Sequence, residues 1–379
     1  MVAVQQEPAM SDPTPAIRIA RKLDIVVIGA GQAGLSAAYH LKGAGLVPNR
    51  DFLVLDSAPR PGGAWQFRWP SLTLSTVNRV HDLPGMSFTE SAGEDPSVQA
   101  AVAVPQYFAA YEDRFDLQVQ RPSTARVVCN RGERLRIETD HGLYSARGLI
   151  NATGTWEKPF IPDYPGADSF AGRQLHTRDY QTASEFAGQH VMVVGAGISA
   201  IQLLDEISRV TTTSWVSRTP PHFRDGSFTP EDGRAAVKLV EDRVRAGLPP
   251  GSVVSVTGLP RSPAIAAMEQ RGALNNQPMF ESMTPTGVRW ADGREQAVDV
   301  ILWCTGFRSA LDHLAPLQLR EPSGGITMTG RLATQVARDP RIHLVGYGPS
   351  ASTIGANRAG AAAAKELLNH LARSASAQG

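Results

Sequence analysis

The sequence predicts an α/β protein built from two Rossmann-like domains, one of which is inserted into the other. The prediction depends first on residues 24–41 and 191–208, where a strand-length apolar run breaks into glycines and resumes as a helix-forming segment. It depends also on a Thr-Gly pair that follows a short apolar run at 153–154 and again at 305–306. We interpret these pairs as the turns at which the chain crosses between lobes.

The composition limits the classes of function. The chain has 379 residues, 42% of them hydrophobic, which is enough for the cores of two domains. With 37 Lys and Arg against 36 Asp and Glu, it lacks the basic surface of a protein that binds nucleic acid or anionic membranes. Its two distant cysteines, Cys129 and Cys304, exclude a disulfide framework, a CxxC redox pair and a zinc ribbon. The nine histidines are scattered and predict no metal site, so redox chemistry would need a bound cofactor.

The N-terminal residues 1–22 contain no continuous apolar core, so we interpret them as a disordered tail and not as a secretory signal. No later stretch reaches the roughly 18 apolar residues that a membrane-spanning helix needs. We therefore expect a soluble, cytoplasmic protein.

The first glycine-rich unit has the spacing of a dinucleotide site. Gly29 permits a tight turn, Gly31 lets the backbone approach a pyrophosphate, and Gly34 lets the helix pack close to the strand. Three glycines alone are a weak signal, but Asp56 ends the next apolar run, where a carboxylate accepts hydrogen bonds from a ribose hydroxyl. The unit therefore suits a dinucleotide with an unmodified ribose.

The second unit repeats the pattern with a basic residue in place of the acid. Gly195, Gly197 and Ala200 occupy the three positions of the turn, and the next strand ends in Ser217-Arg218. A guanidinium can hold a ribose 2′-phosphate, which favours NADPH over NADH, although Arg218 as a solvated loop residue stays an alternative. Two unlike dinucleotide sites in one chain imply electron transfer between two bound cofactors.

Three further segments are candidates for cofactor contacts. The loop around Gly63 and Trp65 either lets its backbone approach a cofactor or is an ordinary Pro/Gly loop with a buried tryptophan. Charged residues at 231–246 predict a helical cap on the inserted domain. A third strand, loop and helix follow at 342–371, and the helix N-terminus there could stabilise the negative charge of a reduced flavin.

The chain resembles the class B flavin-dependent monooxygenases, in their compact bacterial branch. The resemblance depends most on residues 170–180, which are similar to the family's FxGxxxHxxx-aromatic signature, and on 303–307, which are similar to its ATGY-like linker. Tyr180 stands at the aromatic position, as in heteroatom oxidisers, where Baeyer-Villiger members usually have Trp. Cys304 and Phe307 depart from the linker pattern.

The resemblance assigns a cofactor to each domain. It implies an FAD-binding domain made of residues 23–156 and 298–379, and an NADPH-binding domain with the helical cap at 157–297.

The resemblance implies that the flavin carries the chemistry. NADPH reduces FAD, O2 adds to give a flavin hydroperoxide, and a soft heteroatom of a small molecule, such as sulfur or nitrogen, takes one oxygen atom. The alternatives are an FAD-containing NADPH reductase that passes electrons to a quinone or partner protein, and a redox sensor that binds NADPH. We expect small-molecule and O2 partners and neither nucleic acid nor membrane, and we leave open whether the chain forms a homodimer.

Catalytic residues are predicted only weakly. Asn78 lies one place late for the family's asparagine above the flavin, and His176 is either a structural histidine of the linker or a residue near NADPH. The residues predicted to contact the cofactors lie at the glycine turns, at strand ends and in the loops beside them. They are Gly29, Gly31, Gln32, Ala33, Gly34, Asp56, Gly63, Trp65, Val128, Thr153, Gly154, Gly195, Gly197, Ile198, Ser199, Ala200, Ser217, Arg218, Thr305, Gly306 and Ile354.

Overall fold

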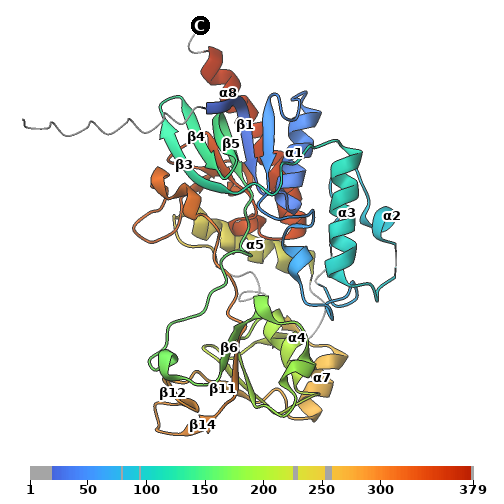
Figure 1. Ribbon diagram of the computed structural model, residues 1–379, viewed down its shortest axis with the longest axis vertical. Coiled ribbons are helices and arrows are strands. Elements are labelled where there is room, and N and C mark those ends of the chain that lie inside the picture. Colours follow the sequence, from blue (N-terminus) through green and yellow to red (C-terminus); the bar gives the residue numbers. More distant parts are fainter. Residues whose placement is uncertain (1–18, 78–79, 94, 225–228, 252–257, 377–379) are drawn as a thin grey trace, which may run out of the picture.

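Two lobes, each built on its own β-sheet, make up the part of the chain that the structure describes (Figure 1). The structure is a computed structural model, and it describes residues 19–77, 80–93, 95–224, 229–251 and 258–376. The predicted α/β class with two Rossmann-type sheets is confirmed.

The first lobe, at the top of Figure 1, has a mixed sheet of eight strands. Its strands are β1 (Ile19–Ile28), β2 (Phe52–Leu55), β3 (Ala125–Arg131), β4 (Arg134–Thr139), β5 (Gly142–Asn151), β16 (Met328–Thr329), β17 (Gln335–Val336) and β18 (Ile342–Leu344). In the centre, β2, β1, β5 and β18 are parallel, while β17 and β16 continue one edge antiparallel. The β3–β4 hairpin pairs antiparallel with β5.

The helices of the first lobe are α1 (Gln32–Gly43), α2 (Phe88–Ala92), α3 (Ala100–Arg114), α5 (Pro230–Arg245) and α8 (Thr353–Ser376). Of these, α1 and α8 pack on the sheet, and the short α2 packs on α3. Small residues let α1 and α8 pack closely, since a Cβ added to Gly360 would stand 2.8 Å from the Ala37 nitrogen. This close packing fixes the start of α8 beside the first glycine turn.

The second lobe, at the bottom of Figure 1, has a parallel sheet in the order β11-β8-β7-β15-β6. These strands are β6 (Arg173–His176), β7 (Val191–Val194), β8 (Thr213–Ser217), β11 (Asn276–Pro278) and β15 (Val300–Trp303), and the lobe's helices are α4 (Ile198–Ile207) and α7 (Pro263–Gln270). Two smaller sheets consist of β9 (Phe223–Arg224) with β10 (Leu259–Pro260), and of β12 (Ser282–Thr284), β13 (Gly287–Arg289) and β14 (Glu295–Ala297).

Short 3-10 helices connect these elements. They are η1 (Gly63–Phe67), η2 (Ala167–Ser169), η3 (Thr177–Asp179), η4 (Ala183–Phe186), η5 (Asp312–Leu317), η6 (Arg331–Ala333) and η7 (Gly348–Ser350).

The structure corrects two predicted boundaries. Residue 298 is too early as the return to the first lobe, because β15 is fully buried and pairs in parallel with both β7 and β6. The chain therefore leaves the second lobe only after Trp303. The predicted tail is also too long, since β1 already begins at Ile19.

The helical cap predicted on the inserted domain packs instead against the first lobe. The helix α5 exists, and it begins with a capping box between Thr229 and Asp232. Its apolar stripe of Ala236, Val240 and Val244 is buried, and Val244 belongs to the core beneath the first sheet. The sequence shows such a stripe but not which lobe it covers.

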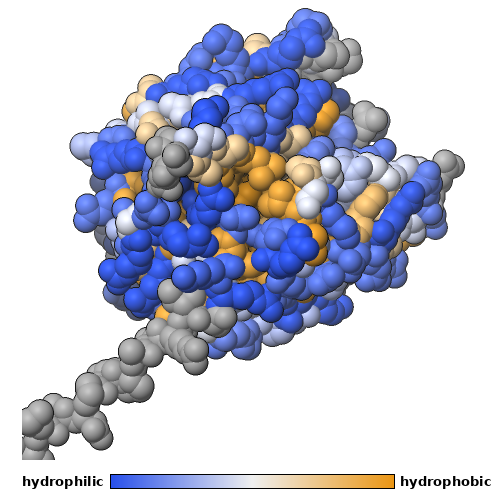
Figure 2. All heavy atoms as spheres, turned by 90° about the horizontal axis from the view of Figure 1, so that it is seen from above, coloured by the Kyte–Doolittle hydropathy of each residue, from blue (hydrophilic) through white to orange (hydrophobic). Residues whose placement is uncertain are grey.

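The molecular surface seen from above is mostly hydrophilic, with hydrophobic residues gathered in the middle of that face (Figure 2). No helix in the described ranges is long and apolar enough to cross a membrane.

Candidate active site

A cleft of about 2170 Å³ is lined by residues of both lobes. From the first lobe it is lined by the first glycine turn, η1, the loop after η1, residues 152–157 and the start of α8. Parts of α4, α5 and α7 complete the lining. Of the residues predicted to contact cofactors, those that line it are Gly29, Gly31, Gln32, Ala33, Asp56, Gly63, Trp65, Thr153, Gly154, Ile198 and Ile354.

The first glycine turn contains two glycines that the fold requires, Gly29 and Gly34, and one, Gly31, that faces open space. A Cβ on Gly29, whose φ is +100°, would stand 2.4 Å from the Ala152 carbonyl oxygen. A Cβ on Gly34 would stand 1.8 Å from the Gly29 carbonyl oxygen. Among the described residues, no atom lies within 4 Å of such a Cβ on Gly31, and Gly31 lines the cleft. The protein itself does not require glycine at 31, so the open space fits a bound ligand.

Asp56 lies buried where β2 reaches the cleft. Its Oδ1 accepts a hydrogen bond from the Ala58 nitrogen at 3.1 Å, and its Oδ2 accepts one from Arg121 Nη2 at 3.3 Å. Arg121 also binds Glu112 through two hydrogen bonds. Burial raises the pKa of Asp56, and the Ala58 and Arg121 contacts act in the opposite direction. No sequence pattern pointed to Arg121, which reaches Asp56 from 65 residues away along the chain.

The second glycine turn repeats the first. A Cβ on Gly195, whose φ is +133°, would stand 2.4 Å from the Cys304 carbonyl oxygen, as Gly29 would from Ala152. Gly197 matches Gly31, since nothing lies within 4 Å of a Cβ there. At the third position Ala200 is buried against the sheet. Within this turn, only Ile198 lines the cleft.

The tip of β8 presents Arg218 to solvent. Within the described residues its side chain makes no hydrogen bond or ion pair, so it is free to bind a phosphate. The neighbouring Ser217 is buried, and its hydroxyl is already engaged with the Thr219 carbonyl and Asn276 Oδ1. Of this predicted pair, Arg218 alone offers an unused donor side chain.

The two Thr-Gly turns hold the connections between the lobes together. The Ala310 nitrogen donates to the Gly154 carbonyl at 3.0 Å, and the Phe160 nitrogen donates to the Gly306 carbonyl at 3.0 Å. Thr153 Oγ1 donates to the Ala310 carbonyl at 2.7 Å, and Thr305 Oγ1 donates to the Phe160 carbonyl. Thr153 and Gly154 line the cleft, whereas Thr305 and Gly306 do not.

His176 is buried and lies outside the cleft. Its Nδ1 accepts a hydrogen bond from the Arg178 nitrogen at 3.1 Å, so Nε2 carries the proton that it donates to the Gly306 carbonyl at 2.9 Å. The ring packs edge-on against Phe307 at 4.8 Å, and burial lowers its pKa. Both ring nitrogens are engaged by backbone, which favours the structural alternative for His176.

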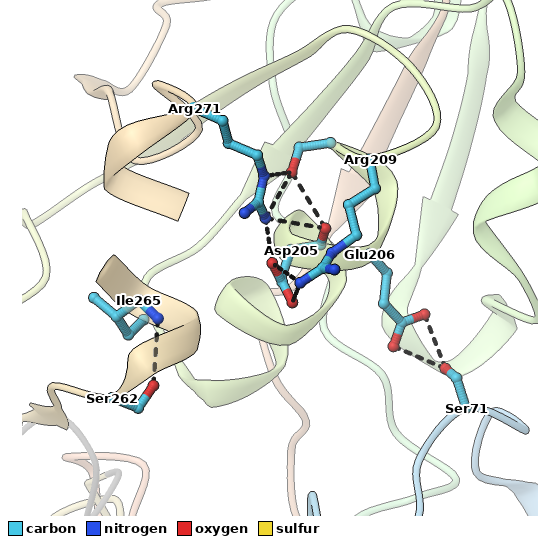
Figure 3. Close-up of polar contacts among 8 residues, drawn as sticks. Ser71, Asp205, Glu206, Arg209, Ser262, Ile265 and Arg271 are labelled. Atoms are coloured by element: carbon cyan, nitrogen blue, oxygen red, sulfur yellow. Dashed lines mark hydrogen bonds and ion pairs between the residues drawn. The ribbon is translucent and has the colours of Figure 1, made fainter. Parts of the chain in front are cut away.

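The signature aromatic Tyr180 is linked to the first lobe through Glu206. Tyr180 is buried, and its hydroxyl donates to Glu206 Oε2 at 2.8 Å. Figure 3 shows the Glu206 carboxylate meeting Ser71 of the first lobe, whose Oγ lies 2.8 Å from both of its oxygens. The adjacent Asp205 binds Arg209 and Arg271 instead (Figure 3). Sequence reasoning missed Glu206, because the contact joins segments far apart in the chain.

The loop that carries Ser71 is anchored in the second lobe. Trp69 and Leu72 are buried in the hydrophobic cluster formed by β6, β7, α4 and α7, and Trp69 meets Tyr180 edge-on at 6.3 Å. Gln202 of α4 also donates to the Thr76 carbonyl at 2.9 Å. This loop runs toward Asn78, which lies outside the described residues.

The predicted cofactor contact Val128 lies in the core of the first lobe. Val128 is fully buried among Leu135, Ile137 and other residues of the first-lobe core, and it does not line the cleft. Gly34 and Ser199 were also predicted as cofactor contacts and do not line the cleft; they lie in the first and the second glycine turn.

A buried polar atom beside the cleft has no hydrogen-bond partner among the described residues, and this also fits a bound dinucleotide. Gln32, in the first turn of α1, donates to Asn357 Oδ1 at 2.9 Å and to the His81 carbonyl at 3.1 Å. Its Oε1 is buried and accepts no hydrogen bond from the described residues. A buried acceptor without a donor lowers the stability of the fold, so a ring N–H of a bound ligand fits beside it.

In the described residues, no group of three His, Cys, Asp or Glu side chains could hold a metal ion.

Comparisons with known proteins agree with this geometry. Residues 26–227 match the family model described as pyridine nucleotide-disulphide oxidoreductase. The solved structure of the flavin-containing monooxygenase from Stenotrophomonas maltophilia has a TM-score of 0.77 and 35% identity, covering 93% of this chain and 99% of that chain. Indole-3-pyruvate monooxygenase YUCCA1 from Oryza sativa subsp. japonica is 30% identical over 75% of this chain and 76% of its own. The uncharacterized oxidoreductase CzcO-like from Geobacillus kaustophilus is 28% identical over 76% of this chain and 81% of its own.

The family match spans more than half of the chain, and the Stenotrophomonas enzyme is covered almost completely. The predicted resemblance and the predicted enzyme class are confirmed, and the predicted pair of FAD and NADPH is that of this family. The chain therefore belongs to the pyridine nucleotide-disulphide oxidoreductase family and, within it, to the flavin-dependent monooxygenases.

Proposed function

We propose that this protein is an FAD- and NADPH-dependent monooxygenase that transfers one oxygen atom from O2 to a soft heteroatom, such as sulfur or nitrogen, of a small molecule. The observation that carries the proposal is the open space beside Gly31, in a cleft lined by both lobes. A second turn of the same construction at Gly197 supplies the place for a second dinucleotide.

The residues of the first lobe would hold FAD. The N–H groups after Gly31 would bind the pyrophosphate, Asp56 would accept from a ribose hydroxyl, and Gln32 Oε1 would accept a ring N–H. The positive end of α8, which starts at Thr353 beside the cleft, favours negative charge on a reduced ring. Bound FAD supplies the chemistry that takes electrons from NADPH and activates O2.

The residues of the second lobe would bind NADPH. Gly197 and Ile198 offer backbone N–H groups at the start of α4, and Arg218 binds the 2′-phosphate. Apolar side chains that line the cleft, among them Leu72, Val77 and Ile201, exclude water from the reacting centre.

The carboxylates that line the cleft are all engaged by other side chains, which favours a substrate that reacts without a protein base. Six carboxylates line it, and each is held by an ion pair or hydrogen bonds: Asp56, Glu157, Asp205, Glu206, Glu241 and Asp242. A sulfide, or an amine in its neutral form, attacks through a lone pair and needs no protein base. This favours a soft heteroatom over a substrate that a base must activate.

The test measures NADPH and O2 consumption with a panel of thioethers, amines, ketones and trivalent arsenicals, scoring oxygenated product against peroxide. We expect a thioether or amine to give product in step with the NADPH consumed. NADPH consumption that gives only peroxide with every member of the panel would point to a reductase or oxidase instead.

A further inference from the structure

An arginine that no sequence pattern singled out lies among aromatic rings in the cleft. Arg68 follows η1 and lines the cleft. Its Cζ lies 4.8 Å from the ring centroid of Trp156 and 5.8 Å from that of Trp65. Phe67 stacks on Trp156 with centroids 6.0 Å apart and planes within 10°. A guanidinium thus sits at a wall made of flat aromatic faces.

The charge of Arg68 has no counter-ion in the described residues. Its side chain forms no hydrogen bond or ion pair there, and its Nε is buried without an acceptor. The acids nearby already have partners, since Glu157 binds Arg178 at 3.3 Å and Glu206 binds Ser71 and Tyr180. Burial lowers the pKa of Arg68 to about 10, so the group stays charged at neutral pH.

A half-buried cation without an acceptor is costly to the fold. Its cation–π contacts offset part of that cost but leave the buried Nε–H donor without an acceptor. An arrangement of this kind is expected where a ligand brings the missing anion.

We propose that Arg68 binds the carboxylate of a planar organic acid, which makes the substrate class anionic and aromatic. This inference rests on the proposed function, in which the cleft holds the substrate. The planar fork of a guanidinium matches a carboxylate with two parallel hydrogen bonds. Trp156 is buried against Arg68 and Phe67, whereas Phe67 itself lines the cleft and is 38% exposed, so Phe67 offers a face to a flat ring. Dinucleotide phosphates share this chemistry, but the two glycine turns already provide backbone donors for them.

The experiment measures binding without turnover. FAD-loaded protein is titrated by calorimetry with 2-naphthoate and with its neutral analogue 2-naphthamide. We expect the acid to bind about tenfold or more tightly than the amide, as charge-assisted hydrogen bonds predict. Arg68→Gln should abolish that preference, and Arg68→Lys, which keeps the charge but loses the fork, should retain only part of it.

The control is Arg358→Gln, because Arg358 lines the same cleft but is exposed. That variant should keep the wild-type preference for the acid. FAD content and NADP+ affinity are measured for every variant, and a melting curve verifies folding. Since binding is measured without oxygenation, the outcome does not depend on whether the monooxygenase proposal holds.

Two results overturn the assignment. If Arg68→Gln keeps the preference for naphthoate but loses FAD or NADP+ affinity, the anion is a dinucleotide phosphate. If Arg68→Gln and Arg68→Lys change none of the three affinities, Arg68 binds no anion.

Discussion

Replacing Gly31 by alanine separates the needs of the fold from those of the cofactor. In the part of the chain that the structure describes, no atom lies within 4 Å of the added Cβ, and the backbone at Gly31 has φ −79° and ψ −171°, which alanine can adopt. The added methyl group instead enters the space where we place the FAD pyrophosphate. We therefore expect Gly31→Ala to fold and to bind FAD poorly.

The magnitudes follow from this geometry. Alanine is a worse N-cap than glycine by about 1 kcal/mol, and the lower entropy of the unfolded chain returns about 0.4 to 1 kcal/mol. The free energy of unfolding of the apoprotein should therefore stay within about 1 kcal/mol of wild type. A methyl group forced against a bound pyrophosphate costs about 1 to 3 kcal/mol, or roughly 5- to 150-fold in the FAD dissociation constant.

Two glycines of the same helix provide the controls. Gly43→Ala at the far end of α1 also meets no atom within 4 Å but lies away from the cleft, so FAD affinity should not change. Gly34→Ala would place its Cβ 1.8 Å from the Gly29 carbonyl oxygen, so it should destabilise the apoprotein itself. The assays are FAD titration of apoprotein and urea unfolding. If Gly31→Ala binds FAD as tightly as Gly43→Ala, the pyrophosphate does not pass Gly31 and the placement of FAD is wrong.

Three further predictions address other parts of the molecule. Tyr180→Phe removes a hydrogen bond to the carboxylate of Glu206, so urea unfolding should show a loss of about 1.5 to 3 kcal/mol; an unchanged value would mean that the bond adds nothing. Arg218→Ala should raise the KM for NADPH about tenfold and leave that for NADH unchanged; equal effects on both would exclude a phosphate contact. Burial lowers the pKa of His343 to about 3, below the unfolded value near 6.5, so stability is complete above pH 6.5 and falls below it. This histidine should account for about 1 kcal/mol of the loss in unfolding free energy between pH 6.5 and 5.5, and His343→Gln should flatten the profile by that amount.

The local parts of the fold were predictable from the sequence. Both glycine turns, the strands before them and the helices after them are encoded by residues within about 20 positions of one another. The same holds for Asp56 and Arg218. Asp56 follows β2, the next strand after the first glycine turn, and Arg218 follows β8, the next strand after the second turn. Each of these features follows from short-range rules of strand, turn and helix.

The contacts between distant segments were not predictable. The interior position of β15 in the second sheet, between β7 and β6, depends on pairing with β7, which lies more than a hundred residues earlier. The apolar stripe of α5 does not state which lobe it covers, and the Glu206 contacts with Ser71 and Tyr180 join three separate segments. Val128 was predicted as a cofactor contact, although a strand residue of this type fits a core equally well.

The central claim is that electrons from NADPH activate O2 for transfer to a substrate held in the cleft. The most direct measurement supplies NADPH, a thioether and isotopically labelled O2 to the FAD-loaded protein and determines the mass of the sulfoxide. We expect one labelled oxygen atom in each product molecule, formed in proportion to the NADPH consumed. NADPH oxidation with unlabelled or absent sulfoxide, and peroxide as the sole oxygen product, would contradict it.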